Sequence, residues 1–413
     1  MTISYLYFTE TNSEPNRVCR QSFPMRHGFI SFILLALTAY GSAAYAAEPT
    51  STLPNGEVVM QQVESETATF RVVQLVNSLE HPWAVDWLPD GRTLVTERSG
   101  NLYLVNGKQV TELSNVPAVW AENQGGLLDV AVAPNYNKTG WIYLTYSARE
   151  NGKGGTVLAR AQLQGSGLTE LEVLYRQTPL LEPDYHFGSR ISFLDDGTLL
   201  VTMGERGQRR EKTVDIPTPS TAVGTTVRLN MDGTIPDDNP FVGQDNAQPA
   251  VYSYGHRNPQ GMAIQPRTGT IWLNEHSPHG GDELNLVKAG NNYGWSAVSY
   301  GDTYRSQRPI GGKTAPGITD PVEYWDPSPG LSGMTFYTGE AFLNWQNDLF
   351  MGALAHQKLI RLELNDNNEV VHEEALLSKQ IGRIRDVATG PGGYLYMLTD
   401  MPNGGLYRLE PGQ

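Results

Sequence analysis

Six copies of one pattern constrain the fold of this chain more than any other feature of its sequence. In each copy, a short apolar run is followed by a turn rich in Pro, Asp, Asn or Gly and then by a second β-rich run. Asp-Gly and similar turns between such runs predict hairpins of two antiparallel strands. The copies lie at residues 82–97, 126–146, 189–202, 261–274, 332–352 and 385–399.

The spacing of the copies indicates the architecture. They begin about 45 to 75 residues apart, which is the scale of one four-stranded propeller blade with loops of variable length. Helical periodicity is nearly absent. The sequence therefore predicts an all-β fold, a six-bladed β-propeller with four-stranded antiparallel blades, because radial repetition leaves only short strand edges around a central channel. Two stacked β-sandwiches are the alternative, since they also give short strands with turn signals.

The first 47 residues have the pattern of a secretory signal. Arg26 and His27 precede an apolar run at residues 29–37, and Ala44-Tyr45-Ala46 ends the segment. The run is shorter than the roughly 20 apolar residues of a membrane span, so we expect cleavage and export, with no membrane insertion afterwards. An uncleaved anchor is the alternative. Met25 is the expected translation start, and residues 48–413 form the single predicted domain, placed in the periplasm or secreted.

Charge and cysteine content limit the partners. The net charge of −14 becomes −15 without residues 1–47, which hold three arginines and two glutamates. An acidic surface repels phosphate backbones, so nucleic acid is not an expected partner. The only cysteine, Cys19, lies in the segment expected to be removed, which leaves no disulfide. Dinucleotide, phosphate-loop, zinc-protease and serine-hydrolase motifs are all missing from the sequence.

Polar residues stand just before the first strand in four of the six copies. In a propeller these positions meet at one mouth of the channel, where we expect the functional site. They are Asn123-Gln124, Asp184-Tyr185-His186, His256-Arg257-Asn258, and Arg383 with Arg385. Three arginines at one mouth of an acidic protein predict an anionic ligand. The alternative is that these residues cap strand ends or pair with carboxylates such as Asp129 and Asp386.

The chain resembles the soluble pyrroloquinoline-quinone (PQQ)-dependent sugar dehydrogenases, specifically the bacterial aldose sugar dehydrogenase branch of the glucose/sorbosone dehydrogenase family. The resemblance extends from Leu79 to Leu409 and rests on motifs that occur in order. They are Gln124-Gly-Gly-Leu-Leu, His186-Phe-Gly-Ser-Arg, Gly204-Glu-Arg-Gly, Gly255-His-Arg-Asn-Pro-Gln-Gly, Gly281-Asp-Glu, Asn292-Tyr-Gly-Trp and Arg383-Ile-Arg-Asp.

The resemblance implies oxidation of aldose sugars at C1 to lactones. His186 would be the general base that takes the proton of the C1 hydroxyl while hydride moves to the quinone, a role that suits an imidazole. Glu205 would orient that imidazole. Arg257 would stabilise negative charge at the quinone edge. An aldose and an external electron acceptor are the implied partners of a monomer or weak dimer.

The resemblance also implies the cofactor and metal contacts. Besides Arg257, the implied PQQ contacts are Gln124, Asn258, Tyr304, the backbone of Ala353 and Leu354, and Arg383 with Arg385. Arginine's forked donors suit the carboxylates of this cofactor. Calcium would polarise the quinone oxygen, bound by backbone carbonyls of the Ser277-Pro278 turn. Glu283 and Tyr293 match further calcium-linked positions, and a second, structural ion is one reading of them.

Two residues depart from the family pattern. Ser277 stands where many relatives have glycine, which adds a Cβ to the turn expected to hold calcium. Ala355 stands where the family often supplies a lysine to the cofactor, and Lys358 lies three residues farther on. We therefore expect weaker or differently balanced cofactor binding.

Two other functions remain open at this point. One is a calcium-dependent lactonase-type propeller hydrolase, which would need a metal-bound water held by carboxylates and Asn and has no use for Arg383 and Arg385. The other is a non-catalytic propeller that binds a carbohydrate or a protein, to which only the alanine at position 355 points.

Overall fold

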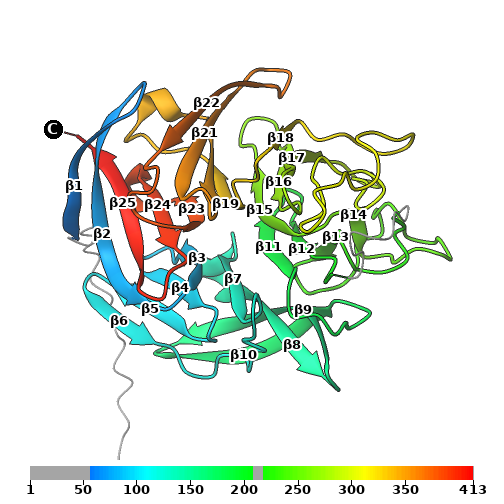
Figure 1. Ribbon diagram of the computed structural model, residues 1–413. Helices are drawn as coiled ribbons and strands as arrows, with labels where there is room; N and C mark the ends of the chain where they lie inside the picture. Colours follow the sequence, from blue (N-terminus) through cyan, green and yellow to red (C-terminus); the bar gives the residue numbers. More distant parts are fainter. Residues whose placement is uncertain (1–55, 208–216, 413) are drawn as a thin grey trace, which may run out of the picture. The chain divides into compact units, whose positions relative to one another are not determined.

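Six sheets surround one central channel, with one hairpin of the repeated sequence pattern in each sheet (Figure 1). The computed structural model describes residues 56–207 and 217–412, so the segment 1–47 lies outside the described residues. The prediction of a six-bladed β-propeller with four-stranded antiparallel blades is confirmed, with one extra strand in the last blade. Stacked β-sandwiches are thereby excluded.

Each blade runs outward from the channel in four steps. The innermost strands are β3 (Pro82–Trp87), β7 (Leu127–Val132), β11 (Gly188–Phe193), β15 (Pro259–Ile264), β19 (Leu331–Phe336) and β23 (Ile384–Thr389). The second strands are β4 (Thr93–Glu97), β8 (Trp141–Glu150), β12 (Thr198–Met203), β16 (Ile271–Glu275), β20 (Leu349–Ala353) and β24 (Leu395–Thr399). The six predicted hairpins are these twelve strands.

The outer half of each blade completes its sheet. The third strands are β5 (Leu102–Asn106), β9 (Lys153–Gln164), β13 (Thr225–Asn230), β17 (Asp282–Val287), β21 (Lys358–Leu364) and β25 (Gly404–Pro411). The fourth strands are β6 (Gln109–Glu112), β10 (Gly167–Arg176), β14 (Val251–Tyr254), β18 (Glu323–Trp325), β22 (Val370–Leu376) and β2 (Thr69–Leu79). The helices of the described residues are short: α1 (Tyr136–Thr139), η1 (Leu343–Trp345) and η2 (Pro391–Gly393). None of them is long and apolar enough to cross a membrane.

The ring is closed by strands from the two ends of the described chain. β2 pairs with β25, and β1 (Glu57–Glu64) pairs with the outer side of β2, so the last blade joins N-terminal and C-terminal segments. Figure 1 shows the blue and red strands side by side. Such pairing across the sequence gives no local turn signal.

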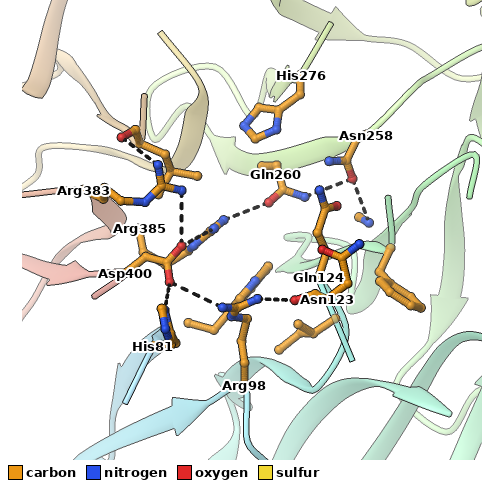
Figure 2. Close-up of a pocket in the computed structure, with 15 residues that line it drawn as sticks. His81, Arg98, Asn123, Gln124, Asn258, Gln260, His276, Arg383, Arg385 and Asp400 are labelled. Carbon is orange, nitrogen blue, oxygen red and sulfur yellow. Dashed lines mark hydrogen bonds and ion pairs between the residues drawn. The ribbon is translucent and has the colours of Figure 1, made fainter. Parts of the chain in front are cut away.

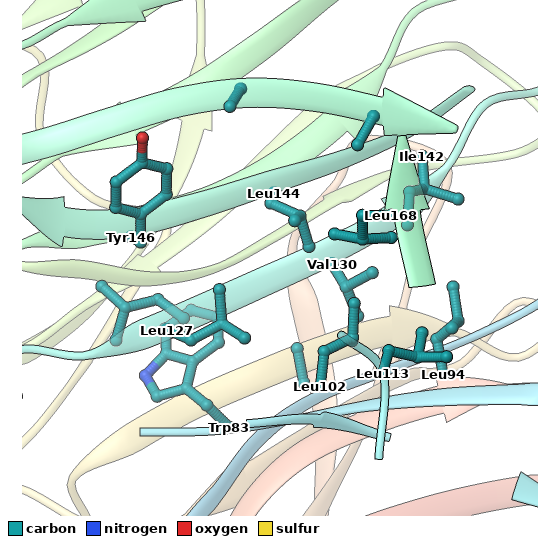
Figure 3. Close-up of a cluster of buried hydrophobic side chains, with 14 of the residues drawn as sticks. Trp83, Leu94, Leu102, Leu113, Leu127, Val130, Ile142, Leu144, Tyr146 and Leu168 are labelled. Atoms are coloured by element: carbon teal, nitrogen blue, oxygen red, sulfur yellow. The ribbon is translucent and has the colours of Figure 1, made fainter. Parts of the chain in front are cut away.

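Apolar side chains fill the spaces between blades. Among the described residues, six buried clusters each combine side chains of two consecutive blades. Figure 3 shows the cluster between the first two blades, where Trp83 and Leu102 meet Leu127 and Leu144. Burial of this kind contributes about 25 cal/mol per Å² of apolar surface, and it fixes the angular position of each blade.

Arg190 crosses the channel axis and binds several blades at once. Its guanidinium lies 3.0 Å from the Asp129 carboxylate, 3.1 Å from the Asp386 carboxylate and 4.5 Å from the Trp83 ring centroid. Its Nε donates to the carbonyl of Gln260 at 3.2 Å. These partners belong to the second, sixth, first and fourth blades, so Arg190 ties four other blades to its own.

Candidate active site at the mouth of the channel

Antiparallel pairing brings two kinds of residue to the same mouth. The residue before an innermost strand and the residue after the second strand lie at the same end of the hairpin. Every innermost strand also has a register shift near its first residues, a bulge that re-aims side chains toward the mouth. Polar groups from all around the ring therefore converge there.

Two adjoining cavities occupy this mouth, with volumes of ≈ 350 Å³ and ≈ 450 Å³. Both are lined by Gln124, His276, Leu354 and Arg383, so they form one continuous space. Figure 2 shows the first, where guanidinium, imidazole and amide groups from several blades face one another. The space is large enough for a flat cofactor with a small ligand above it.

His186 enters the second cavity already paired with a carboxylate. Its Nδ1 lies 2.6 Å from Oε1 of Glu205, and its backbone N–H donates to Oε1 of Gln124 at 2.9 Å. Glu205 is 1% exposed. With Nδ1 donating its proton to Glu205, Nε2 is the ring nitrogen left to accept a proton. Burial, followed by the positive charge of Arg257, lowers the pKa of His186 to about 4. The imidazole is therefore a neutral base at pH 7.

Arg257 is held by backbone carbonyls rather than by an acid. Its Nη1 donates to the carbonyls of His276, at 2.9 Å, and Ser277, at 3.1 Å. Its Nε is buried without a hydrogen-bond partner among residues 56–207 and 217–412. Asn258 lies beside it, and its Oδ1 accepts from the N–H of Gly188 at 3.3 Å. The positive charge of Arg257 thus stays available to a ligand.

Arg383 and Arg385 share one carboxylate, that of Asp400. Nη2 of Arg385 lies 3.0 Å from Oδ2 of Asp400, and Nη2 of Arg383 lies 3.5 Å from the same atom. His81 contacts Oδ1 at 2.7 Å, and Arg98 lies 3.8 Å from it. Burial would raise the pKa of Asp400, but the charge of Arg385 and the hydrogen bond from His81 hold that pKa well below its usual range.

The charge balance of the first cavity fits an anion. Three guanidinium groups, from Arg98, Arg383 and Arg385, face a single carboxylate. The Nε atoms of Arg98 and Arg385 are buried and have no hydrogen-bond partner in the part of the chain that the structure describes. Buried donors without acceptors are costly, so a ligand with several carboxylates would be bound favourably here. Of the three arginines expected at the mouth, Arg383 and Arg385 share Asp400 and Arg257 donates to backbone carbonyls. Asp129 and Asp386 pair with Arg190 instead, so the alternative of pairing with protein acids accounts for only part of the positive charge.

The residues expected to hold metal are divided between two places. Ser277 and Pro278 line the second cavity, although the carbonyl of Ser277 also accepts from Arg257. Glu283 lies outside both cavities. Burial, with the nearby Glu275, Asp282 and Asp320 carboxylates, raises the pKa of Glu283 well above its usual value.

Tyr293 also lies outside both cavities. Its ring stacks on that of His256 with centroids 4.6 Å apart, and its hydroxyl donates to the carbonyl of Leu286 at 2.5 Å. In the described residues no group of three or more His, Cys, Asp or Glu side chains could ligate a metal.

Most of the chain matches a known protein family. The model of the Glucose / Sorbosone dehydrogenase family matches residues 79–408. The chain belongs to the glucose/sorbosone dehydrogenase family. The aldose sugar dehydrogenase YliI of Escherichia coli (strain K12) is 40% identical to it over 392 residues, which are 92% of this chain and 98% of that relative.

Solved structures of the glucose/sorbosone dehydrogenase type have the same fold. The apo form of the soluble aldose sugar dehydrogenase from Escherichia coli matches with a TM-score of 0.79 and 41% identity over 83% of this chain and 99% of that one. The PQQ-bound form of aldose sugar dehydrogenase from Streptomyces coelicolor matches with a TM-score of 0.66 and 26% identity over 83% and 99%. The chain is therefore an oxidoreductase of the sugar dehydrogenase type.

The structure gathers most of the expected site residues. Those that line one or both cavities are Gln124, His186, Arg257, Asn258, Ser277, Pro278, Tyr304, Leu354, Arg383 and Arg385. Glu205 stands behind His186. Ala353 is buried and lines neither cavity. Ala355 lines the second cavity, whereas Lys358 pairs with Glu373 at 3.2 Å.

Sequence patterns missed several residues that line the site. Arg98, His276 and Asp400 each follow directly after a second strand, and His81 precedes the first innermost strand. His81 could have been found by the rule that found His186 and Arg383. The other three need the complementary rule, that antiparallel pairing returns the end of the second strand to the same mouth.

Proposed function

We propose that this protein catalyses PQQ-dependent oxidation of aldose sugars at C1 to lactones. One observation carries the proposal: a neutral imidazole paired with a buried carboxylate opens into the same space as an arginine-rich anion site. A base for the sugar hydroxyl and a binding site for an anionic cofactor thus lie at one mouth. Membership of the family and the PQQ-bound relative support the choice of cofactor.

The proton chemistry belongs to His186. Nε2 accepts the proton of the C1 hydroxyl, and the Glu205 carboxylate stabilises the imidazolium that forms. When bound, PQQ supplies an ortho-quinone that takes the hydride from C1. Arg257 and Asn258 would contact the quinone edge, and the carbonyls that hold Arg257 fix its guanidinium in that direction. General-base catalysis of this kind contributes about 10²- to 10⁴-fold to the rate.

The remaining residues bind and orient. Arg383 and Arg385 would hold cofactor carboxylates, with Asp400 keeping the two guanidinium groups in place. Gln124, Tyr304 and the backbone of Ala353 and Leu354 would complete the binding site. Calcium would be held by the Ser277 and Pro278 carbonyls, which are the hard oxygen ligands it takes, together with cofactor oxygens. A second ion at Glu283 and Tyr293 remains part of the proposal, because buried acids there would be stabilised by a cation.

The geometry favours this function over the two alternatives. A calcium-dependent lactonase needs free carboxylates over the channel, but Glu205 and Asp400 are engaged by His186 and Arg385. A non-catalytic carbohydrate- or protein-binding propeller has no need for an imidazole held against a buried carboxylate. The alanine at position 355 leaves the site without the lysine that the family often supplies. Arg98, Arg383 and Arg385 still give it three guanidinium groups.

A reconstitution assay tests the proposal. Purified protein would be loaded with calcium and PQQ and given an aldose with an artificial electron acceptor. We expect acceptor reduction with one lactone formed per two electrons, and none without PQQ. Hydrolysis of an added lactone without acceptor reduction would identify the lactonase instead. Sugar binding without turnover would identify a binding module.

Export is a separate part of the proposal. Residues 1–47 would direct the protein to the periplasm or the medium and then be removed. Mass spectrometry of the protein from its native host would show a mature chain that begins near Glu48 if this is correct.

A further inference from the structure

The loop that carries His186 has little regular backbone pairing of its own. It connects β10 to β11, and His186 has a φ of +57°, a left-handed conformation that residues other than glycine rarely adopt. Near His186 the loop is held by Gln124, which accepts from the N–H of His186 and donates its own N–H to the carbonyl of Asp184. Farther from His186, Leu181 and Gly154 exchange backbone hydrogen bonds, and Asn123 donates to the Asp184 carboxylate. A left-handed residue persists only where the surrounding contacts hold it, so the contacts beneath the loop also bear on this conformation.

Arg206 lies beneath that loop and uses each of its nitrogens. The side chain is fully buried, and its Nε donates to the carbonyl of Tyr185 at 3.0 Å. Nη2 donates to the carbonyl of Pro183, and Nη1 donates to the carbonyl of Gly154 in β9 at 2.6 Å. The guanidinium carbon lies 3.8 Å from the Phe187 ring centroid. Two loop carbonyls are thereby tied to the second blade.

The charge of Arg206 persists although its immediate acceptors are neutral. Burial lowers its pKa to about 10, which still leaves the guanidinium protonated at neutral pH. Its forked donors point in fixed directions, and stacking on Phe187 fixes the plane of the fork. Lysine has one nitrogen and could satisfy only part of this set of carbonyls.

From these contacts we infer that Arg206 is the positioning residue of His186, holding the left-handed loop so that Nε2 faces the cavity. The inference rests on the proposed function and extends it to a residue outside the cavities. Glu205 and Arg206 are consecutive, so one short segment after β12 orients the imidazole with one side chain and its backbone with the next.

Activity measurements give the first test. In Arg206→Met the loop carbonyls lose their donors, so the His186 imidazole should lose the orientation in which Nε2 faces the substrate. We expect kcat to fall about 100-fold for this reason. The PQQ dissociation constant should stay within about 3-fold, since Arg383 and Arg385 keep their contacts. Arg206→Lys should give an intermediate kcat. An unchanged kcat in Arg206→Met, with wild-type protein active, would overturn the inference and leave the proposed function standing.

A readout without cofactor gives the second test. Burial and the Arg257 charge lower the pKa of His186, whose other charged and titratable neighbours are Glu205, His276 and Tyr185. NMR titration of the imidazoles in cofactor-free protein, with His186→Gln used for assignment, should find the His186 pKa below 5. In Arg206→Met or Arg206→Lys that pKa should move toward the ordinary value of about 6.5. An unmoved pKa in both variants would contradict the positioning role.

A matched control separates positioning from general stability. Arg361 is also fully buried, but it pairs with Asp348 and Glu374 near the outside of the fifth blade. Arg361→Met should lower the melting temperature and leave kcat and the His186 pKa unchanged. If Arg206→Met and Arg361→Met differ from wild type only in stability, Arg206 is structural and the inference is wrong. If wild type itself fails to oxidise any aldose, the proposed function fails, and the NMR titration still decides the role of Arg206.

Discussion

Nδ1 of His186 lies 2.6 Å from Oε1 of Glu205, and this contact joins the loop before the third blade's innermost strand to the segment after its second strand. The pair comes from one hairpin, and Gln124 and Arg206 tie its loop to the second blade. The arginines of the anion site come from other blades. The angular positions of the blades around the ring therefore decide whether His186 and the arginines face the same cavity.

Glu205→Gln should separate orientation from charge. The amide oxygen can still accept from Nδ1, but the negative charge that stabilises the imidazolium is lost. We expect kcat to fall about 100-fold with little change in KM. The acid limb of the kcat–pH profile should move to lower pH, because the carboxylate is one of the groups that raise the pKa of His186. Steady-state kinetics over a range of pH measures kcat, KM and the position of the acid limb. An acid limb that moves to higher pH would contradict this role of Glu205.

The depressed pKa of His186 also predicts a dependence of stability on pH. The folded value is about 4 and the unfolded value about 6.5, so the unfolded chain binds more protons between them. Stability should therefore fall as the pH drops from 6.5 to 4, by at most about 3 kcal/mol from this group. Denaturant unfolding of His186→Gln should show a flatter pH profile over this range. His279→Gln, at an exposed histidine, should keep the wild-type slope.

Asp400→Asn should make cofactor binding more stabilising. The variant leaves Arg385 buried beside Arg98 and Arg383 without an acid, which should cost the cofactor-free protein about 3 kcal/mol. Added PQQ should then raise the melting temperature more than in wild type, because its carboxylates replace the missing charge. Glu374→Gln removes a comparable partner of Arg361 away from the site. It should lower the melting temperature but leave the gain from PQQ unchanged, and equal gains in the two variants would contradict the proposal that Arg383 and Arg385 bind the cofactor carboxylates.

Ala355→Lys should tighten PQQ binding. Ala355 lines the second cavity, so a lysine there would add a cation that Lys358, paired with Glu373, does not supply. One charged hydrogen bond corresponds to about a tenfold lower dissociation constant. Ala355→Gln, of similar length without charge, is the control. Unchanged or weaker affinity in the lysine variant would count against this placement.

The hairpins were predictable because their signals are local. The Leu-Pro-Asp-Gly-Arg segment at residues 88–92 and its counterparts mark each turn within a few residues of both strands. Ring closure was not predictable in this way, since β2 pairs with β25 across more than 300 residues and no turn joins them. Only the geometry of the closed ring supplies that contact.

The same distinction between local and long-range signals applies to the residues of the candidate site. His186 and Arg383 could be identified because each stands just before an innermost strand. Asp400 could not, because its importance comes from three arginines and His81, which lie far from it in sequence or on other strands. Arg206 likewise gains its role from carbonyls in a loop whose path the sequence does not reveal.

The most direct test of the account is the turnover number of His186→Ala after loading with calcium and PQQ. Wild type and variant would be compared with the same aldose and electron acceptor at saturating concentrations, with PQQ occupancy confirmed by absorbance. We expect a loss of about 10²- to 10⁴-fold in kcat, the range that follows removal of a general base. Undiminished acceptor reduction by fully loaded His186→Ala would contradict it.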